Sequence, residues 1–545
     1  MTPALPADAE QFDYVVVGGG TAGALIASRL SEDGVSTVCL LESGPSDWHP
    51  YIHIPAGYIK NVFGSRFTWG FESEPSVGTA GRRFSLPQGR VLGGSGSING
   101  LNHVRGQAAD YDDWAALGNP GWSYQDVLPY FKKSERRIGP GDDQYRGRTG
   151  ELPITDLDWQ HPLLDAFTRG LVELGLPRNA DYNGASRDGV GVYQRAILNG
   201  RRHSSAVAFL RPARRRGNLE VRTDAHAAAI VFDGRRAVGV RYMRGGANGA
   251  LQTVRARREV IVCAGAVNTP KLLQLSGVGP LPLLQGLGIP VVHELPGVGE
   301  NLRDHYAIRM VARARNTKTI NNLVTGLPLL WQIARWLAGR PSLLAVSPSL
   351  IGAFWRSAPE VQRSDLQFTF TPASFRAGVV GLLDKFPGMT VGVWQCRPES
   401  LGHVRAVSPD PLARPQIQPN YLAHETDQRV LLAGIRLARS FLGSQALAPY
   451  FDSEIAPGAN MVSDDELLQF ARENGTTVYH LIGTARMGPA SDPHAVVDQQ
   501  LKPYGLDGLR IADASIMPTM PSANTNATTL MIAEKAAAMI VADRR

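Results

Sequence analysis

The sequence predicts an α/β protein (α+β overall) in which a Rossmann-like domain is combined with a second domain built on an antiparallel sheet with helices. Two patterns support this class. A strand, a glycine turn, a helix and a second strand follow one another over residues 12–44. From about residue 306 to residue 452, short alternating runs separated by proline and glycine are typical of antiparallel strands. At 545 residues, the chain is also too long for one ordinary core.

Composition and charge exclude several classes of function. The net charge of +7 comes from scattered basic residues, and the densest cluster, Arg211–Asn218, is typical of a solvated helix end, so we expect no nucleic-acid partner. The three cysteines lie far apart and show no metal-type spacing, which predicts a reducing compartment and no metal site. The N-terminal segment lacks the pattern of a secretory signal, and no apolar run reaches about 18 residues, so we expect a cytoplasmic protein.

Three glycines with fingerprint spacing follow the first predicted strand. Gly18 permits the sharp turn, Gly20 lets the backbone approach a pyrophosphate, and Gly23 lets the following helix pack closely on the strand. Glu42 ends the next strand, where a carboxylate accepts hydrogen bonds from ribose hydroxyls. Because strand, turn, helix, strand and acid come in this order, the sequence predicts a dinucleotide site.

The rest of the chain favours FAD over NAD as the dinucleotide. Only one such fingerprint is present in the sequence, which argues against a flavin enzyme with a second, NAD-binding Rossmann unit. A second loop rich in glycine and serine, Gly89–Gly106, suits close backbone approach along a long planar cofactor.

Later segments complete the first predicted domain. Residues 218–245 alternate like a meander of strands with a turn at Asp233 and Gly234. The run "REVIVCAGAVNTPKLLQLSG" predicts a buried strand and a helix that begins near Thr269 and Pro270. "LRIADASIMP" predicts another strand, and "TTLMIAEKAAAMIVADRR" predicts the closing helix.

The predicted division of the chain is discontinuous. We assign residues 1–155, 195–305 and 482–545 to the FAD-binding domain, and residues 156–194 and 306–481 to the substrate-binding domain. Within the latter, residues 327–339 predict a helix with an aromatic and aliphatic face. Contact with a membrane surface is compatible with this face, but packing over a pocket is favoured.

Several long motifs resemble the glucose-methanol-choline oxidoreductase family, the FAD-dependent alcohol oxidases and dehydrogenases. "GRVLGGSGSIN" resembles the first signature of that family and "GAVNTPKLLQLSGVG" the second; the likeness continues through residues 297–305, 477–488 and 509–537. This resemblance implies a choline dehydrogenase-like enzyme that oxidises an alcohol to an aldehyde or ketone by hydride transfer to flavin N5. The implied electron acceptor is oxygen, a quinone or a dye.

The resemblance also implies which residues bind FAD. These are Gly18, Gly20, Thr21, Ala22, Gly23 and Glu42 at the adenosine end, Ala227 through its main chain at adenine, Gly93, Gly94, Ser95 and Asn99 beside the pyrophosphate and flavin ring, Asp513 and Ala514 near the ribityl chain, and Asn526 and Thr529 at the pyrimidine edge. Ile98 stands where family members with covalently attached flavin have histidine. We therefore expect non-covalent FAD.

The predicted catalytic pair is His480 and Asn524. A lone histidine in an apolar stretch more often forms a structural hydrogen bond than takes part in catalysis. The resemblance places His480 at the flavin face, as the base that takes the hydroxyl proton, and Asn524 beside it, as a donor to the developing alkoxide. The alternative for Asn524 is an ordinary turn cap.

Other residues carry weaker hypotheses. His103 is interpreted either as lining the route to the flavin or as a polar surface substitution, and His305 as ordering a domain junction. Cys396 is interpreted as a buried inert thiol. The pocket walls are expected to include the aromatic residues Trp355, Phe370 and Trp394.

The same fold leaves three alternative functions open. These are a hydroxynitrile lyase-like enzyme, a fatty-acid photodecarboxylase-like enzyme and a flavin-binding protein without turnover. Retention of both His480 and Asn524 favours alcohol oxidation over the photodecarboxylase. No aromatic cage or carboxylate for a quaternary ammonium is evident in the sequence, so choline itself is not singled out as the substrate.

Overall fold

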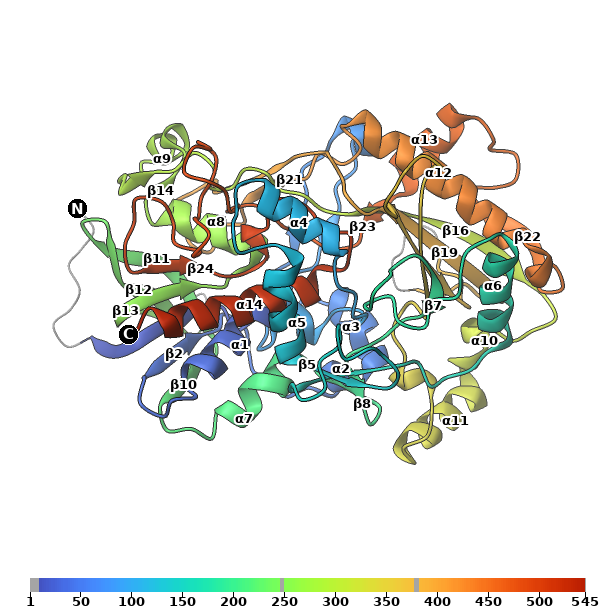
Figure 1. Ribbon diagram of the computed structural model, residues 1–545, viewed down its shortest axis with the longest axis horizontal. Helices are drawn as coiled ribbons and strands as arrows, with labels where there is room; N and C mark the ends of the chain where they lie inside the picture. The colour runs from blue at the N-terminus through green and yellow to red at the C-terminus, as the bar shows by residue number, and fades with distance from the viewer. Residues whose placement is uncertain (1–8, 246–248, 377–381, 545) are drawn as a thin grey trace.

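Two β-sheets organise the molecule, and each carries its own layer of helices (Figure 1). The computed structural model describes residues 9–245, 249–376 and 382–544. The first sheet lies on the left of Figure 1 and the second on the right. The predicted α/β class with two kinds of sheet is confirmed.

The first sheet has the strand order β10 (Leu219–Arg222), β2 (Val38–Leu41), β1 (Glu10–Val17), β13 (Ala250–Val262), β12 (Arg236–Arg244) and β11 (Ala225–Asp233), with β24 (Leu509–Ile511) beside β13. The pairs from β10 to β13, and the pair of β13 with β24, are parallel. Strands β11, β12 and β13 form the predicted antiparallel meander, and the turn between the first two contains Gly234, whose φ is +57°. Strand β2 and the second half of β1, Tyr14–Val17, are buried and apolar, as is typical of strands in the middle of a covered parallel sheet.

Helices pack around this sheet, namely α1 (Thr21–Leu30), α4 (Ala108–Ala116), α5 (Tyr124–Ser134), α8 (Gly265–Leu275), α9 (Leu281–Gly286) and α14 (Thr525–Ala542). The closing helix α14 lies between α1 and α5 (Figure 1). Nearly every residue of α1 is buried, which explains its lack of a polar face.

Helix α8 begins at Gly265, not near Thr269 as the sequence predicted. Pro270 therefore lies inside the helix, where its missing N–H leaves the carbonyl of Ala266 without its usual partner. The hydroxyl of Thr484 donates to that carbonyl at 2.6 Å. A side chain distant in the sequence thus allows the helix to continue through a proline, and no local pattern could have revealed it.

The second sheet is antiparallel throughout, in the order β22 (Phe451–Ala456), β16 (Tyr306–Ala314), β19 (Gly388–Gln395), β18 (Leu366–Thr371), β17 (Ile351–Trp355) and β7 (Gly189–Val192), with β23 (Thr476–Thr477) beside β16. Helices α6 (Pro162–Glu173) and α12 (Glu425–Leu442) cover one face of it, and α13 (Asp464–Asn474) packs on α12. The predicted antiparallel sheet with helices on one side is confirmed. Its other face is turned toward the first sheet.

The helix predicted over residues 327–339 is present as α11 (Gly326–Leu337), at the lower right of Figure 1. It contributes no side chain to the main cavity, so the interpretation that it packs over a pocket is wrong. Leu327, Leu330 and Trp331 are instead 81%, 61% and 62% exposed. Among the described residues, no helix is both long and apolar enough to cross a membrane.

Short elements complete the fold. They are α2 (Pro50–His53), α3 (Tyr58–Val62), α7 (Arg211–Ala213), α10 (Ile320–Leu323), β3 (Phe71–Glu72), β4 (Ser85–Leu86), β5 (Glu135–Ile138), β6 (Leu152–Thr155), β8 (Ile197–Leu198), β9 (Arg201–Arg202), β14 (Val278–Gly279), β15 (His293–Glu294), β20 (His403–Arg405) and β21 (Gln416–Gln418).

Candidate active site

A cavity of about 930 Å³ is lined by residues of both sheets and their loops. It reaches from Gly18 and Glu42, at the carboxyl ends of β1 and β2, to His480 and the open face of the second sheet. Every residue predicted for the site lines this cavity except Gly23 and Gly93. Segments that are up to 500 residues apart in the chain therefore meet around one space, as the Thr21 to Asn526 contact shows.

Close backbone packing explains the three fingerprint glycines. Gly18 has a φ of +99°, and a Cβ there would lie 2.5 Å from the carbonyl oxygen of Cys263. A Cβ at Gly23 would lie 1.9 Å from the carbonyl oxygen of Gly18, so this glycine sets how closely α1 approaches β1. At Gly20 the nearest atom to such a Cβ is the Cα of Gly94, at 3.8 Å. A Cβ at Gly94 would lie only 2.7 Å from the Cα of Gly20, so the two glycine loops touch each other at this point.

Glu42 lies buried beside these loops. Its carboxylate accepts hydrogen bonds from the N–H groups of Gly19 at 2.8 Å and Gly44 at 2.7 Å. Burial nevertheless raises the pKa of Glu42 to about 7, against the lowering effect of these two bonds. A ribose hydroxyl donating to this carboxylate would stabilise its ionised form, so Glu42 fits the nucleotide that the resemblance implies.

The second glycine loop is joined directly to the first. The N–H of Gly93 donates to the carbonyl of Gly19 at 2.7 Å, which explains its position behind the cavity wall. Ser95 accepts from the N–H of Gly89 at 3.0 Å, and Asn99 accepts from the guanidinium of Arg202 at 2.9 Å. Both side chains thus hold the loop in place while its backbone faces the cavity.

Residues near the C-terminus close the same region. Asp513 accepts hydrogen bonds from the N–H of Gly265 at 2.8 Å and the hydroxyl of Thr269 at 2.6 Å, at the N-terminus of α8. Asn526 accepts from Thr21 at 2.9 Å. The remaining predicted residues Ala22, Ala227, Ala514 and Thr529 line the cavity without a polar contact across it. The glycine backbone that lines the cavity and the buried carboxylate of Glu42 together fit the binding of FAD.

His480 stands at the other end of the cavity. Strand β23 ends at Thr477 and Tyr479 adopts a left-handed φ of +69°, so His480 lies in the loop that follows this strand. The ring of His480 makes two contacts: its Nε2 lies 3.0 Å from Nδ2 of Asn524, and its Nδ1 lies 2.9 Å from Nδ1 of His305.

Asn524 occupies the N-cap position of α14, but its side chain forms no capping hydrogen bond. The side chain extends to His480, and its oxygen accepts from the Nε2 of Gln367 at 3.2 Å. The turn-cap alternative is therefore wrong for this residue. Gln367 fixes which end of the amide faces the histidine, because its N–H must meet an oxygen.

A chain of hydrogen bonds sets the tautomer of His480. The Nε2 of His305 lies 2.8 Å from the carbonyl oxygen of Cys396, which can only accept, so this nitrogen carries a hydrogen. Burial lowers the pKa of His305 to about 4, so its Nδ1 keeps a lone pair and accepts from the Nδ1–H of His480. The Nε2 of His480 therefore carries the lone pair, which accepts from the Nδ2–H of Asn524. Burial, with a contribution from His305, also holds the pKa of His480 well below its usual value.

Asp304 anchors both histidines. Its buried carboxylate accepts from the main-chain N–H of His480 at 2.7 Å and that of His305 at 2.9 Å, and from the hydroxyls of Tyr421 and Thr477. Burial raises the pKa of Asp304 to about 6 despite these bonds. Sequence reasoning missed Asp304 and gave His305 only a structural role. Their adjacency in "NLRDH" was the one available signal, and it carried no sign of contact with residue 480.

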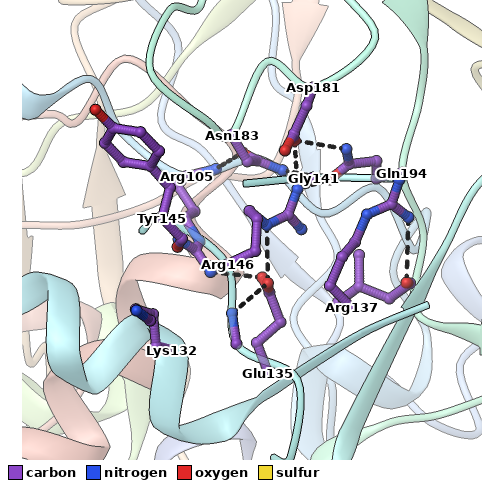
Figure 2. A network of polar contacts seen from close by, with 12 residues as sticks. Arg105, Lys132, Glu135, Arg137, Gly141, Tyr145, Arg146, Asp181, Asn183 and Gln194 are labelled. Atoms are coloured by element: carbon purple, nitrogen blue, oxygen red, sulfur yellow. Dashed lines mark hydrogen bonds and ion pairs between the residues drawn. The ribbon is translucent and has the colours of Figure 1, made fainter. Parts of the chain in front are cut away.

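His103 contacts a separate buried network around Glu135, and Figure 2 shows Glu135 with its two arginines. There Glu135 lies between Arg105, at 2.6 Å, and Arg146, at 2.8 Å, and the Nε2 of His103 lies 3.3 Å from the same carboxylate. Burial opposes ionisation of Glu135, but these cations hold its pKa well below the usual value. His103 neither lines the cavity nor lies on the surface, so both interpretations of it were wrong.

The expected pocket walls are only partly correct. Trp394 lines the cavity, but Trp355 and Phe370 do not. Phe370 stacks on Phe167 of α6, with ring centroids 4.1 Å apart, because alternate residues of a strand face opposite sides of the sheet. Cys396 is buried, and burial raises the pKa of its thiol to about 12, in agreement with an inert thiol.

Comparisons with known proteins agree with this geometry. The sequence models of the family described as GMC oxidoreductase match residues 12–307 with their N-terminal part and residues 398–533 with their C-terminal part. An oxygen-dependent choline dehydrogenase of Rhizobium johnstonii is 40% identical over 530 residues, which cover 97% of this chain and 95% of that protein. An alcohol dehydrogenase [acceptor] of Pseudomonas putida is 39% identical, covering 97% and 96%.

Solved structures give the same result. A pyridoxine 4-oxidase from Mesorbium loti superposes with a TM-score of 0.86 at 31% identity, covering 97% of this chain and 98% of that one. A formate oxidase from Aspergillus oryzae gives a TM-score of 0.90 at 25% identity, covering 99% of each chain. The chain described here belongs to the GMC oxidoreductase family and is an FAD-dependent enzyme that oxidises CH–OH donors.

Proposed function

We propose that His480 is the base of this oxidation and that Asn524 is its partner. The observation that carries the proposal is the relay from Cys396 through His305 to His480, which leaves a lone pair on Nε2. That nitrogen and the amide of Asn524 both line the cavity. An alcohol is a poor hydride donor until its oxygen loses its proton, so a neutral imidazole in reach of the hydroxyl is what the reaction needs.

The residues divide the chemistry as follows. Bound FAD supplies the acceptor for the hydride that leaves the carbinol carbon. The substrate hydroxyl replaces the Nδ2–H of Asn524 at the Nε2 of His480, and Nε2 then takes the hydroxyl proton. The Nδ1–H of His480, already donated to His305, spreads the positive charge that results. The N–H of Asn524, whose oxygen is anchored by Gln367, donates to the substrate oxygen as negative charge develops there.

Replacement of the base tests the proposal. His480→Ala should reduce the rate of flavin reduction by at least about 100-fold while FAD stays bound, measured by anaerobic stopped-flow absorbance with an alcohol. His494→Ala is the matched control, because that histidine is exposed and outside the cavity. A rate within a few fold of wild type would place the base elsewhere. Anaerobic bleaching of the flavin by an alcohol is expected for the proposed oxidation. It is not expected for a lyase-like enzyme or for a flavin-binding protein without turnover.

We also propose that FAD is held without a covalent bond. Ile98 lines the cavity with an apolar side chain, which offers no atom for attachment. Acid precipitation or boiling should therefore release the yellow cofactor into the supernatant, as followed by absorbance. Colour that stays in the pellet would contradict the proposal.

Three further predictions remain proposals. The reoxidant is oxygen or a quinone or dye, since one relative is named oxygen-dependent and another carries an unspecified acceptor. The division at residues 1–155, 195–305 and 482–545 agrees with the placement of the strands, because all strands of the first sheet fall within those ranges. Residence in the cytoplasm is supported by the cysteine pattern, which is typical of a reducing compartment.

A further inference from the structure

The open face of the second sheet forms the floor of the cavity beside His480, and strand register divides this floor into rows. We name two of them: the catalytic row consists of Ala307, Trp394 and Gln367, and the second row consists of Arg309, Gly392 and Thr369. Gln367 bonds to Asn524, and the ring of Trp394 lies 6.3 Å from that of His480, so the catalytic row lies next to the base. The second row is two residues farther along each strand, or about 7 Å.

Arg309 brings a positive charge to the second row. It lines the cavity, and the described residues place no carboxylate within 4.0 Å of its guanidinium. Gly392 stands opposite on β19 and has no side chain to cover it. Arg309 also lies close enough to Tyr58 and Tyr479 to act on their phenols. Burial raises the pKa of each phenol, and the positive charge of Arg309 lowers it. The cation therefore faces the same space as the residue that precedes His480.

Trp394 adds a second donor without an acceptor. Its indole Nε1–H is buried and has no hydrogen-bond partner among the described residues, although the residue lines the cavity. A buried N–H without a partner has lost its hydrogen bonds to water and gained none in return, so such a group is a candidate to donate to a ligand. Two donors on neighbouring rows thus lack acceptors within the part of the chain that the structure describes.

We infer that Arg309 and Trp394 form a subsite for a carboxylate carried by the substrate, so that the alcohol oxidised here is a hydroxy acid. This rests on the proposed function, because the hydroxyl of the same molecule must reach His480. A carboxylate accepts from a guanidinium and an indole N–H at once, and it neutralises the charge of Arg309. The spacing of the two rows sets a chain of a few carbons between the carboxylate and the carbinol carbon.

The same floor disfavours a quaternary ammonium. Neither row contains a carboxylate, and a cation bound there would face Arg309 in a site shielded from water. Asp384 does line the cavity, but it precedes the first residue of β19, whereas Arg309 lies opposite the middle of that strand. The carboxylate of Asp384 therefore lies near the start of β19, whereas the catalytic row lies near the end of that strand.

A series of primary alcohols tests the inference. Wild-type holoenzyme would be given HO–(CH2)n–COO⁻ with n from 2 to 6, the neutral alkanol of each length, and choline, with flavin reduction as the readout. We expect the best hydroxy acid to exceed its matched alkanol in kcat/KM by about 10- to 100-fold, mainly through KM, and choline to fall below the alkanol. Choline above the hydroxy acids would overturn the inference.

Variants assign the effect to the two residues. Arg309→Gln should lower kcat/KM for the best hydroxy acid and leave the matched alkanol within a few fold. For Trp394→Phe, whose ring lies near His480, the expected change is a lower ratio of kcat/KM for the hydroxy acid to kcat/KM for the alkanol. Arg313→Gln is the control, because Arg313 lies on the same strand but outside the cavity. An unchanged ratio of hydroxy acid to alkanol in Arg309→Gln would refute the subsite.

Binding without turnover supplies an independent readout. Hexanoate lacks the hydroxyl, so it should perturb the flavin absorbance of wild type and bind at least about 10-fold more weakly to Arg309→Gln. Equal binding to both proteins would count against the inference. The proposed function is judged separately: if alkanols reduce the flavin in a His480-dependent way, it stands whichever acid preference is found, and it fails if no alcohol does so.

Discussion

The two ends of the cavity are built by opposite means. At the nucleotide end, glycines bring backbone against backbone, as in the contact of Gly23 with Gly18. At the floor formed by the second sheet, side chains from β16, β18 and β19 face the substrate, and the backbone is occupied by sheet pairing. The first end recognises a constant cofactor by shape, and the second can change its chemistry one side chain at a time without disturbing the fold.

The largest expected effect comes from adding a methyl group at the nucleotide end. In Gly23→Ala the new Cβ would lie 1.9 Å from the carbonyl oxygen of Gly18, so α1 must move away from β1. We expect protein purified without stoichiometric FAD and with a lower melting temperature, measured by absorbance and calorimetry. Gly286→Ala is the control, since nothing lies within 4 Å of a Cβ there. Full FAD content in Gly23→Ala would show that close backbone packing at the nucleotide end is not required for binding FAD.

A smaller effect is expected where the floor meets the base. His305→Phe removes the acceptor for the Nδ1–H of His480 and keeps an aromatic ring in place. We expect kcat to fall about 10- to 100-fold with little change in KM, because His305 positions the base without touching substrate.

The pH profile separates this role from a loss of structure. The working form of His480 is neutral, so activity is present above its pKa and is lost as the pH falls through it. Because burial lowers that pKa, the acid limb of kcat should lie below pH 6.5 in wild type and in His305→Phe alike. An acid limb at pH 6.5 or above in wild type would contradict the buried, neutral base.

The smallest effect concerns helix α8, which supports the nucleotide end. Thr484→Val leaves the carbonyl of Ala266 without its donor, and we expect the free energy of unfolding in urea to fall by about 1–3 kcal/mol. Adding Pro270→Ala should recover part of this loss, because residue 270 then offers an N–H to the same carbonyl. Equal stability of the single and double variants would show that the hydroxyl does not replace the missing bond.

The contrast between the two ends also explains what the sequence could predict. The glycine fingerprint and Glu42 form a local pattern, and their strands and helix were predicted correctly from the spacing of apolar residues. The floor is assembled by register between β16, β18 and β19, which local sequence does not encode. That is why Trp355 and Phe370 were placed on the wrong face, whereas Trp394 was placed correctly.

The relay at the base shows the same limit. His480 and Asn524 could be predicted because each lies in a motif that resembles one family. Asp304, His305 and Gln367 form the contacts that orient this pair, but they are distant in sequence and of ordinary residue types. Their roles follow from hydrogen-bond partners that only the folded chain brings together.

The relay is one of the places where the two halves of the protein meet. Asn524 occupies the N-cap position of a helix on the first sheet, Gln367 lies on β18 of the second sheet, and His305 directly precedes β16 of that sheet. A displacement of one half relative to the other by little more than an ångström would leave the coenzyme bound but would stop turnover. The catalytic rate of this enzyme therefore depends on the relative position of its two halves.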